Sequence, residues 1–232
     1  MRRVLAVAAL GLIALGGWMV VRDRLRGYSS TRGARIEHVT LHSRLLRRDL
    51  HEVVVTPRRH SHVLLVFLHG RSSPPSSNLT QQLFDTLHDL GPRAPVVLLA
   101  DGGDHSYWHD RADGPWGTSL LREVIPDGVR RSHARAVAIG GISMGGFGAL
   151  DVARLAPRRF CAVGAHSAAL WFGGADTPSG AFDDAQDFAR HDVIRFARAR
   201  GLYRSPVWID VGRESVLPGR SRPRARAPGA RD

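Results

Sequence analysis

Short apolar runs alternate with amphipathic stretches along most of this chain, beginning near Ile36. Several of the apolar runs, such as Val63–Leu68, contain no polar residue, as expected for parallel strands that are covered on both faces. The predicted strands are 36–42, 51–55, 63–68, 95–100, 136–140, 160–165 and 206–211. The predicted helices are 80–90, 119–131, 144–155 and 181–200. This alternation predicts a doubly wound α/β fold with a mostly parallel sheet.

The N-terminus does not follow this pattern. Residues 4–21 are uncharged and lie between basic flanks at both ends. As a helix they would span about 27 Å, close to the bilayer thickness of about 30 Å. No A-x-A-like cleavage site precedes the second basic flank, so we expect an uncleaved signal anchor. We expect a single-pass protein of the cell membrane with an extracytoplasmic domain, although arginines on both sides decide the orientation only weakly.

Composition divides the chain into four parts. We expect the anchor at 1–26, a linker at 27–35, one α/β domain at 36–212 and a disordered tail rich in Arg and Pro at 213–232. The net charge is +12, but most of it lies in the two ends. The domain carries no basic stripe, which argues against nucleic acid as a partner. The single cysteine, Cys161, excludes an intrachain disulfide, and its apolar neighbours predict a buried thiol.

One motif carries the chemistry. Gly141-Ile-Ser143-Met-Gly145 joins the predicted strand 136–140 directly to the predicted helix 144–155. In this context G-x-S-x-G is typical of a nucleophile elbow, a strained turn that holds the serine hydroxyl above the sheet. The alternative is a glycine-rich turn or a phosphate loop, but neither G-x-G-x-x-G nor a Walker lysine is present. Ser143 is therefore the predicted nucleophile.

A second motif agrees with the first. The strand 63–68 is followed by His69-Gly70-Arg71, an arrangement that supplies a backbone amide to an oxyanion hole. The backbone N–H groups of Arg71 and Met144 are the expected oxyanion donors. His69 itself is expected to be a hydrogen-bonded core residue, because the chemistry uses the backbone beside it.

The sequence resembles an esterase family of the α/β-hydrolases, which contains feruloyl esterases, S-formylglutathione hydrolase and mycolyltransferases. The stretches that carry the resemblance are 67–70 (FLHG), 101–108 (DGGDHSYW), 140–146 (GGISMGG) and 206–212 (PVWIDVG). The resemblance covers about residues 36–212. It implies an α/β-hydrolase fold and a serine ester hydrolase or acyltransferase that needs no metal or organic cofactor. The implied substrate is a small-molecule or lipid-like ester.

The loop 101–116 should lie over the Ser143 end of the sheet, where such folds bind ligands. Its aromatic residues and one further tryptophan are expected to be either walls of a substrate pocket or core residues; they are Tyr107, Trp108, Trp116 and Trp171. The polar residues of the loop match no metal-binding spacing, so we predict no metal site. Three acidic residues further on should form the solvated first turn of a helix; they are Asp183, Asp184 and Asp187.

The remaining triad members are not at their expected positions. The fold places the acid and then the histidine after the nucleophile, and the resemblance puts the acid at position 215, which is Ser215. Glu214 and Asp210 are weak acid candidates. The histidines end at His191, so His166, which ends the strand beside the nucleophile strand, is a remote candidate for the base. We therefore expect a truncated or frameshifted hydrolase that lacks the last helix and strand, with impaired activity, or a non-catalytic membrane-anchored binding module.

Overall fold

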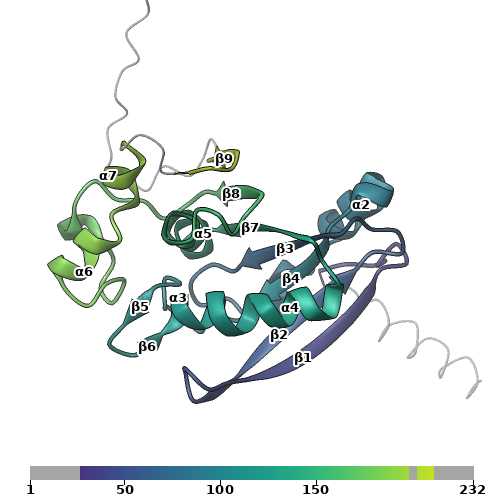
Figure 1. The fold of residues 1–232 in the computed structure, drawn as a ribbon, viewed down its shortest axis with the longest axis horizontal. Coiled ribbons are helices and arrows are strands. Elements are labelled where there is room, and N and C mark those ends of the chain that lie inside the picture. Colours follow the sequence, from purple (N-terminus) through teal and green to yellow (C-terminus); the bar gives the residue numbers. More distant parts are fainter. Residues whose placement is uncertain (1–26, 199–202, 212–232) are drawn as a thin grey trace, which may run out of the picture.

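The computed structural model describes residues 27–198 and 203–211. Their centre is a seven-stranded sheet in the order β1-β2-β4-β3-β7-β8-β9 (Figure 1). The first two pairings, β1 with β2 and β2 with β4, are antiparallel, and the other four are parallel. The prediction of a mostly parallel α/β sheet is therefore confirmed.

All seven predicted strands are present, with ends that differ by at most three residues. They are β1 (Arg35–Ser43), β2 (Arg48–Thr56), β3 (Val63–Leu68), β4 (Val96–Ala100), β7 (Ala136–Ile142), β8 (Ala162–His166) and β9 (Val207–Asp210). A separate two-stranded ribbon joins β5 (Asp110–Arg111) and β6 (Gly114–Pro115) within the loop after β4.

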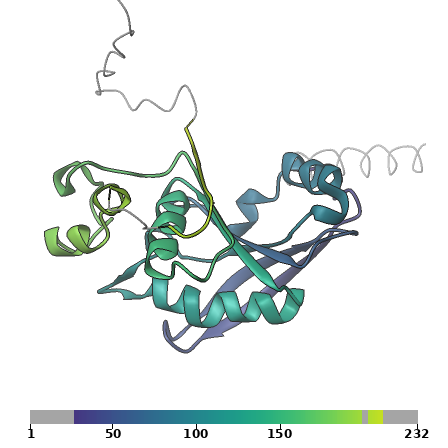
Figure 2. The same ribbon diagram turned by 45° about the horizontal axis from the view of Figure 1, so that its top comes forward.

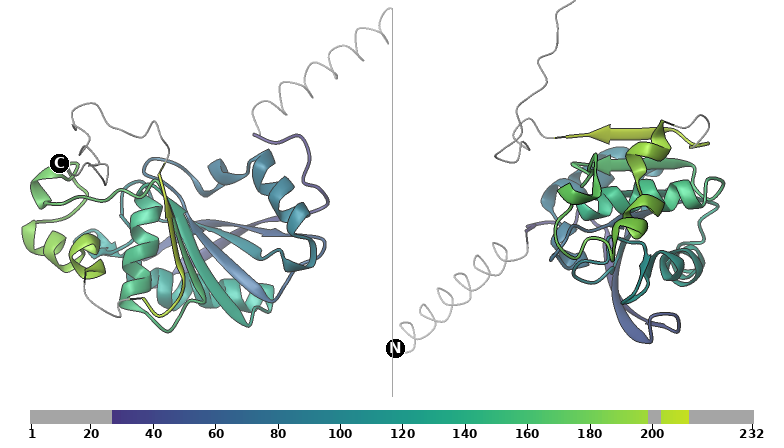
Figure 3. Two further views of the ribbon diagram at one scale, coloured as in Figure 1. Left: turned by 90° about the horizontal axis from the view of Figure 1, so that it is seen from above. Right: turned by 90° about the vertical axis from the view of Figure 1, so that its left-hand side faces the viewer.

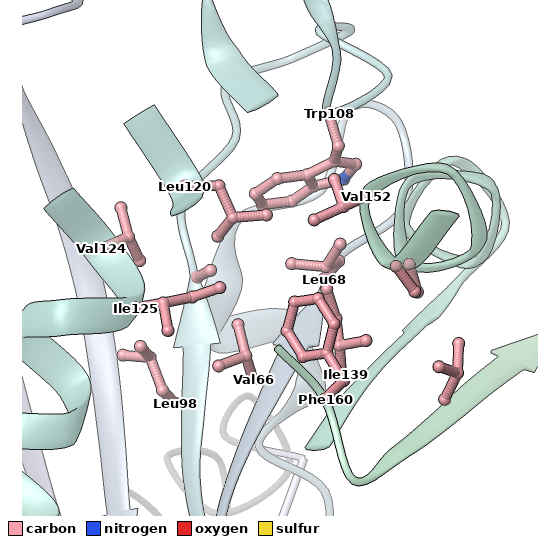
Figure 4. Packing of buried hydrophobic residues seen from close by; sticks show 14 of the residues in the cluster. Val66, Leu68, Leu98, Trp108, Leu120, Val124, Ile125, Ile139, Val152 and Phe160 are labelled. Carbon is pink, nitrogen blue, oxygen red and sulfur yellow. The ribbon is translucent and has the colours of Figure 1, made fainter. Parts of the chain in front are cut away.

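Helices cover both faces of the sheet (Figure 3). The helical segments are η1 (Pro75–Asn78), α2 (Gln81–Leu90), η2 (Gly91–Arg93), α3 (Trp116–Ser119), the π-helical η3 (Leu120–Val124), α4 (Ile125–Ser132), α5 (Met144–Leu155), η4 (Gly174–Asp176), α6 (Ala185–Arg190) and α7 (Val193–Ala197). Alternate residues of one strand belong to different cores: Leu98 of β4 packs on the side of α4 and α5, and Leu99 packs on the side of α2. Because successive side chains of a strand point to opposite faces of the sheet, there is one hydrophobic core on each face. Figure 4 shows part of the core on the α4 and α5 side.

Two predictions from the sequence are wrong. The stretch 181–200 is not one helix, because Asp184 caps α6 and Asp192 caps α7, each accepting a hydrogen bond from an amide three residues later. Figure 2 shows the excursion from β8 through these two short helices before the chain reaches β9. Cys161 is exposed rather than buried, because it lies just before β8, where its amide bonds to the Val137 carbonyl and its side chain faces outward.

The C-terminal edge of the described sheet is apolar and open. β9 pairs only with β8, and Val207, Trp208 and Ile209 are all exposed. Successive residues of a strand point to opposite faces, so both faces of β9 are uncovered in the described part of the chain. Among the described residues β9 is therefore an edge strand with unpaired backbone groups on one side.

The predictions for the two ends lie mostly outside the described residues. The anchor at 1–26 and the tail at 213–232 with Glu214 are in this group. Among the helices of residues 27–198 and 203–211, none combines the length and the apolar character needed to cross a bilayer. The predicted linker 27–35 lies against α2, where the Gln81 side chain accepts hydrogen bonds from the amides of Ser29 and Ser30.

Candidate active site

Ser143 sits in a strained turn between β7 and α5. Its φ is +54° and its ψ is −114°, a conformation that residues with a side chain rarely adopt. Three backbone hydrogen bonds of 3.0 Å hold it: its amide donates to the His166 carbonyl, and its carbonyl accepts from the amides of Phe147 and Ala169. The side chain is exposed. The turn therefore presents the hydroxyl at the carboxyl end of the sheet.

The two glycines of the motif allow this turn to pack against β3. A Cβ at Gly145 would lie 2.0 Å from the carbonyl oxygen of Leu68, and a Cβ at Gly141 would lie 2.4 Å from the Gly145 backbone. Neither position has room for a side chain. The elbow predicted from G-x-S-x-G is thus present in its physical details, with glycine required on both sides of the serine.

His69 anchors the loop after β3. Its Nε2 accepts a hydrogen bond from the Gly102 amide at 3.0 Å, so the neutral ring carries its proton on Nδ1 and donates it to the Gly70 carbonyl at 2.8 Å. Burial lowers the pKa of His69, which favours this neutral form. His69 is therefore the hydrogen-bonded core residue that the sequence predicts.

The loop that His69 anchors lies beside the serine. A Cβ at Gly70 would lie 3.6 Å from the Cβ of Ser143. The amide of Arg71 follows in this loop, and the amide of Met144 is the first of α5. Within the described part of the chain neither amide donates a hydrogen bond, so both can serve an external acceptor.

The four aromatic candidates have different surroundings. Trp108 is only 2 % exposed and lies between Leu120 and the α5 residue Val152 (Figure 4). It packs so closely on Gly102 and Gly148 that a Cβ at either glycine would lie within 2.6 Å of its atoms. Trp108 is thus a core residue, which was the alternative to a pocket wall.

Of the other three aromatic candidates, Tyr107 and Trp116 are buried, at 3 % and 6 % exposure, and Trp171 is partly buried. Trp116 lines a cleft of about 500 Å³ together with Gly103 and Asp104. The Asp104 carbonyl accepts a hydrogen bond from the Ser72 amide at 2.8 Å, which ties this cleft to the loop that carries Arg71. The remaining two candidates belong to one aromatic cluster, in which the ring centroids of Tyr107 and Trp171 are 5.7 Å apart.

The structure reveals a buried ionic cluster that the sequence did not predict. Asp187 is fully buried, and its Oδ2 lies 3.1 Å from Nε2 of the buried His109. Next to it, Nδ1 of His191 lies 2.7 Å from Oδ2 of Asp151, a buried residue of α5. The prediction that Asp187 lies in a solvated helical turn is therefore wrong. Its helix, α6, packs against the loop after β4, and this contact buries the carboxylate beside His109.

The electrostatics of this cluster favour the ionised carboxylate. Burial alone would raise the pKa of Asp187, but the Asp183 amide and the hydrogen bond and charge of His109 lower it. Burial, followed by the charge of His191, lowers the pKa of His109. The cluster connects the loop 101–116 and α6 to α5. The three acidic residues Asp183, Asp184 and Asp187 were a sequence signal for such a cluster, but the sequence did not indicate which residues would be their partners.

The structure also joins two candidates that the sequence left separate. Nδ1 of His166 lies 2.9 Å from both carboxylate oxygens of Asp210. The residues end β8 and β9 and are paired in the register of these strands. Their side chains are partly exposed, at 47 % for His166 and 36 % for Asp210.

Comparison with solved structures shows which known proteins have a similar fold. Similar structures include a ferulic acid esterase, with 20% identity over 71% of this chain and 68% of that chain and a TM-score of 0.56. The S-formylglutathione hydrolase from Agrobacterium tumefaciens has 18% identity over 82% and 80% of the two chains and a TM-score of 0.57. FphF, a fluorophosphonate-binding serine hydrolase of Staphylococcus aureus, has 18% identity over 77% and 79% and a TM-score of 0.58. These likenesses define the α/β-hydrolase fold.

The family follows from the sequence itself. Residues 51–226, well over half of the chain, match the model of the family described as "Putative esterase". The chain belongs to this family, and by family the protein is an esterase. The match continues into the predicted tail, which begins at residue 213. A search of curated proteins found no match.

Proposed function

We propose that the protein is a serine carboxylic-ester hydrolase that works through an acyl-enzyme on Ser143. The observation that carries the proposal is the strained, exposed position of Ser143 at the start of α5, with φ at +54°. A folded protein retains such strain where the surrounding structure enforces it, and it does so most often at functional sites. The membership of the chain in an esterase family supports the same chemistry.

The reaction proceeds by two acyl transfers. The Ser143 Oγ attacks the ester carbonyl carbon to give a tetrahedral intermediate. When this intermediate collapses, its C–O bond to the alcohol breaks, the alcohol leaves and the acyl-serine remains. Water then attacks the acyl-serine and releases the acid. The amides of Arg71 and Met144 donate to the oxyanion in both steps, and one such donor contributes about 10²–10³ in kcat.

The substrate in this proposal is a small-molecule ester. Its non-reacting part would lie in the cleft that Trp116 lines, because the Ser72 amide joins this cleft to the oxyanion loop through the Asp104 carbonyl. Trp171, which is only partly buried and packs against Tyr107, offers a second apolar surface. Trp108 has no part in binding, since it is enclosed in the core.

A fluorophosphonate probe tests the nucleophile. It phosphonylates an activated serine, so the full-length wild type should be labelled and Ser143→Ala should not. Ser132→Ala is the matched control, because the Ser132 hydroxyl donates only to backbone carbonyls of α4, those of Gly128 and Val129. Its labelling should equal that of the wild type. Peptide mapping of the wild-type adduct should find the phosphonate on the peptide that contains Ser143.

Two results would refute the proposal. Equal labelling of the wild type and Ser143→Ala would mean that another residue reacts. No labelling of a folded wild type, with no ester hydrolysis above the rate of Ser143→Ala, would favour a non-catalytic binding module instead.

A further inference from the structure

Three adjacent strands end in three residues with the chemistry of a catalytic triad. Ser143 follows β7, His166 ends β8 and Asp210 ends β9, and β8 lies between the other two strands. In the strand register Ile142 pairs with His166, and His166 pairs with Asp210. The histidine therefore lies between the serine and the carboxylate at the carboxyl edge of the sheet.

The hydrogen bond to Asp210 sets the protonation of the His166 ring. A carboxylate only accepts hydrogen bonds, so the ring nitrogen that faces it, Nδ1, must carry a proton. In the neutral ring the lone pair is then on Nε2, which has no partner among the described residues. A general base needs this tautomer and a third group that fixes it.

Backbone hydrogen bonds hold the main chains of the proposed nucleophile, base and acid next to one another. The Ser143 amide donates to the His166 carbonyl at 3.0 Å, and the Ser167 amide donates to the Asp210 carbonyl at 2.8 Å. The His166 ring makes no hydrogen bond to Ser143 in this structure and is about half exposed, so it has room to turn. Catalytic hydrogen bonds are often long without substrate and shorten when substrate binds.

We propose that His166 is the general base of this enzyme and that Asp210 orients it, so that Ser143, His166 and Asp210 form the triad. This inference rests on the proposed serine esterase function. As Ser143 Oγ bonds to the ester carbon, its proton moves to Nε2 of His166 and the carbonyl π electrons move to oxygen. When the C–O bond to the alcohol breaks, Nε2–H returns that proton to the leaving oxygen. In deacylation the same ring takes a proton from the attacking water and returns it to Ser143 Oγ as the acyl–oxygen bond breaks.

The alternative is a surface ion pair with no catalytic role, and the chain contains a matched example. Nδ1 of His42 lies 2.8 Å from Oδ1 of Asp49 across the β1–β2 hairpin, with both side chains exposed. This pair also joins neighbouring strands, but it lies at the far edge of the sheet from β9. His42→Gln therefore controls for the loss of an exposed cross-strand pair.

The experiment compares His166→Gln, Asp210→Asn and His42→Gln in the full chain. We measure the rate of fluorophosphonate labelling at Ser143, and kcat and KM for a p-nitrophenyl ester, with the thermal midpoint of each variant as a folding control. His166→Gln should lower the labelling rate and kcat by about 10²–10⁴ with little change in KM. Asp210→Asn should also lower kcat, because an amide can donate to Nδ1 and favour the wrong tautomer. His42→Gln should match the wild type in labelling rate and kcat, which are the quantities compared because its partner Asp49 lines the Trp116 cleft and could affect KM.

The results separate this inference from the proposed function. If the wild type labels on Ser143 and His166→Gln, folded to the same thermal midpoint, labels equally fast, the triad assignment is wrong and the nucleophile assignment stands. If a folded wild type does not label on Ser143, both are wrong. A deficit in His42→Gln as large as that in His166→Gln would also overturn the triad, because it would trace the loss to ion pairing in general.

Discussion

Replacing Gly145 with alanine adds one methyl group at the tightest contact of the elbow. The new Cβ would lie 2.0 Å from the Leu68 carbonyl oxygen and 2.7 Å from that of His69. Restoring an ordinary contact of about 3.5 Å requires the start of α5 and the end of β3 to separate by about 1.5 Å. β3 is hydrogen-bonded to β4 on one side and β7 on the other, so it cannot yield easily.

The expected cost follows from that geometry. Overpacking a core usually costs about 1–3 kcal/mol. Because the atom in the way is backbone in a central strand, we expect Gly145→Ala to lose about 3 kcal/mol or more. Gly164→Ala is the control, since a Cβ there would meet only the Gly140 Cα at 4.0 Å. Its effect should stay within about 1 kcal/mol of the wild type.

Urea unfolding followed by tryptophan fluorescence measures both variants, with the free energy of unfolding obtained by linear extrapolation. The rate of fluorophosphonate labelling of the folded protein measures the geometry of the turn at Ser143 separately from stability. Gly145→Ala should be labelled more slowly, because the substitution displaces the serine. The reasoning fails if Gly145→Ala unfolds within about 1 kcal/mol of the wild type. It also fails if Gly164→Ala is as unstable as Gly145→Ala.

Three further predictions concern other parts of the chain. Burial raises the pKa of Glu52 well above its usual value of 4.5, so its ionisation lowers the stability of the fold as the pH rises above 4.5. Glu52→Gln should therefore become more stable relative to the wild type toward neutral pH. A difference between their urea midpoints that does not change with pH would contradict this. Asp187→Asn removes the buried charged partner of His109 and should lower the free energy of unfolding by about 1.5–3 kcal/mol. Asp89→Asn, which changes an exposed residue of α2, should change it by less than about 0.5 kcal/mol in the same unfolding assay. If residues 4–21 form the proposed anchor, the full chain should stay in the membrane fraction after alkaline carbonate washing, and a variant without residues 1–26 should be released; release of both would exclude the anchor.

The sequence by itself determined the strands of the sheet and the sharp turn at Ser143. Continuous apolar runs such as Val63–Leu68 indicated buried parallel strands, and all seven predicted strands are present. The motif around Ser143 indicated a strained turn, because the close approach of Gly141 to the Gly145 backbone is a contact within the motif itself, whereas the contact of Gly145 with Leu68 is tertiary. His69 could likewise be interpreted as a core residue from its position directly after a strand. These features are encoded within a few residues of one another.

Only the tertiary structure decided which distant side chains meet. The pairing of His166 with Asp210 spans 44 positions and that of His109 with Asp187 spans 78. Residues this far apart in the sequence share no helical or strand periodicity. The local pattern could therefore suggest an acidic helical turn at Asp187, but it could not indicate that Asp187 is buried. The order of β7, β8 and β9 decides that His166 lies between Ser143 and Asp210. Such contacts arise from the packing of whole strands and helices, which local sequence patterns do not contain.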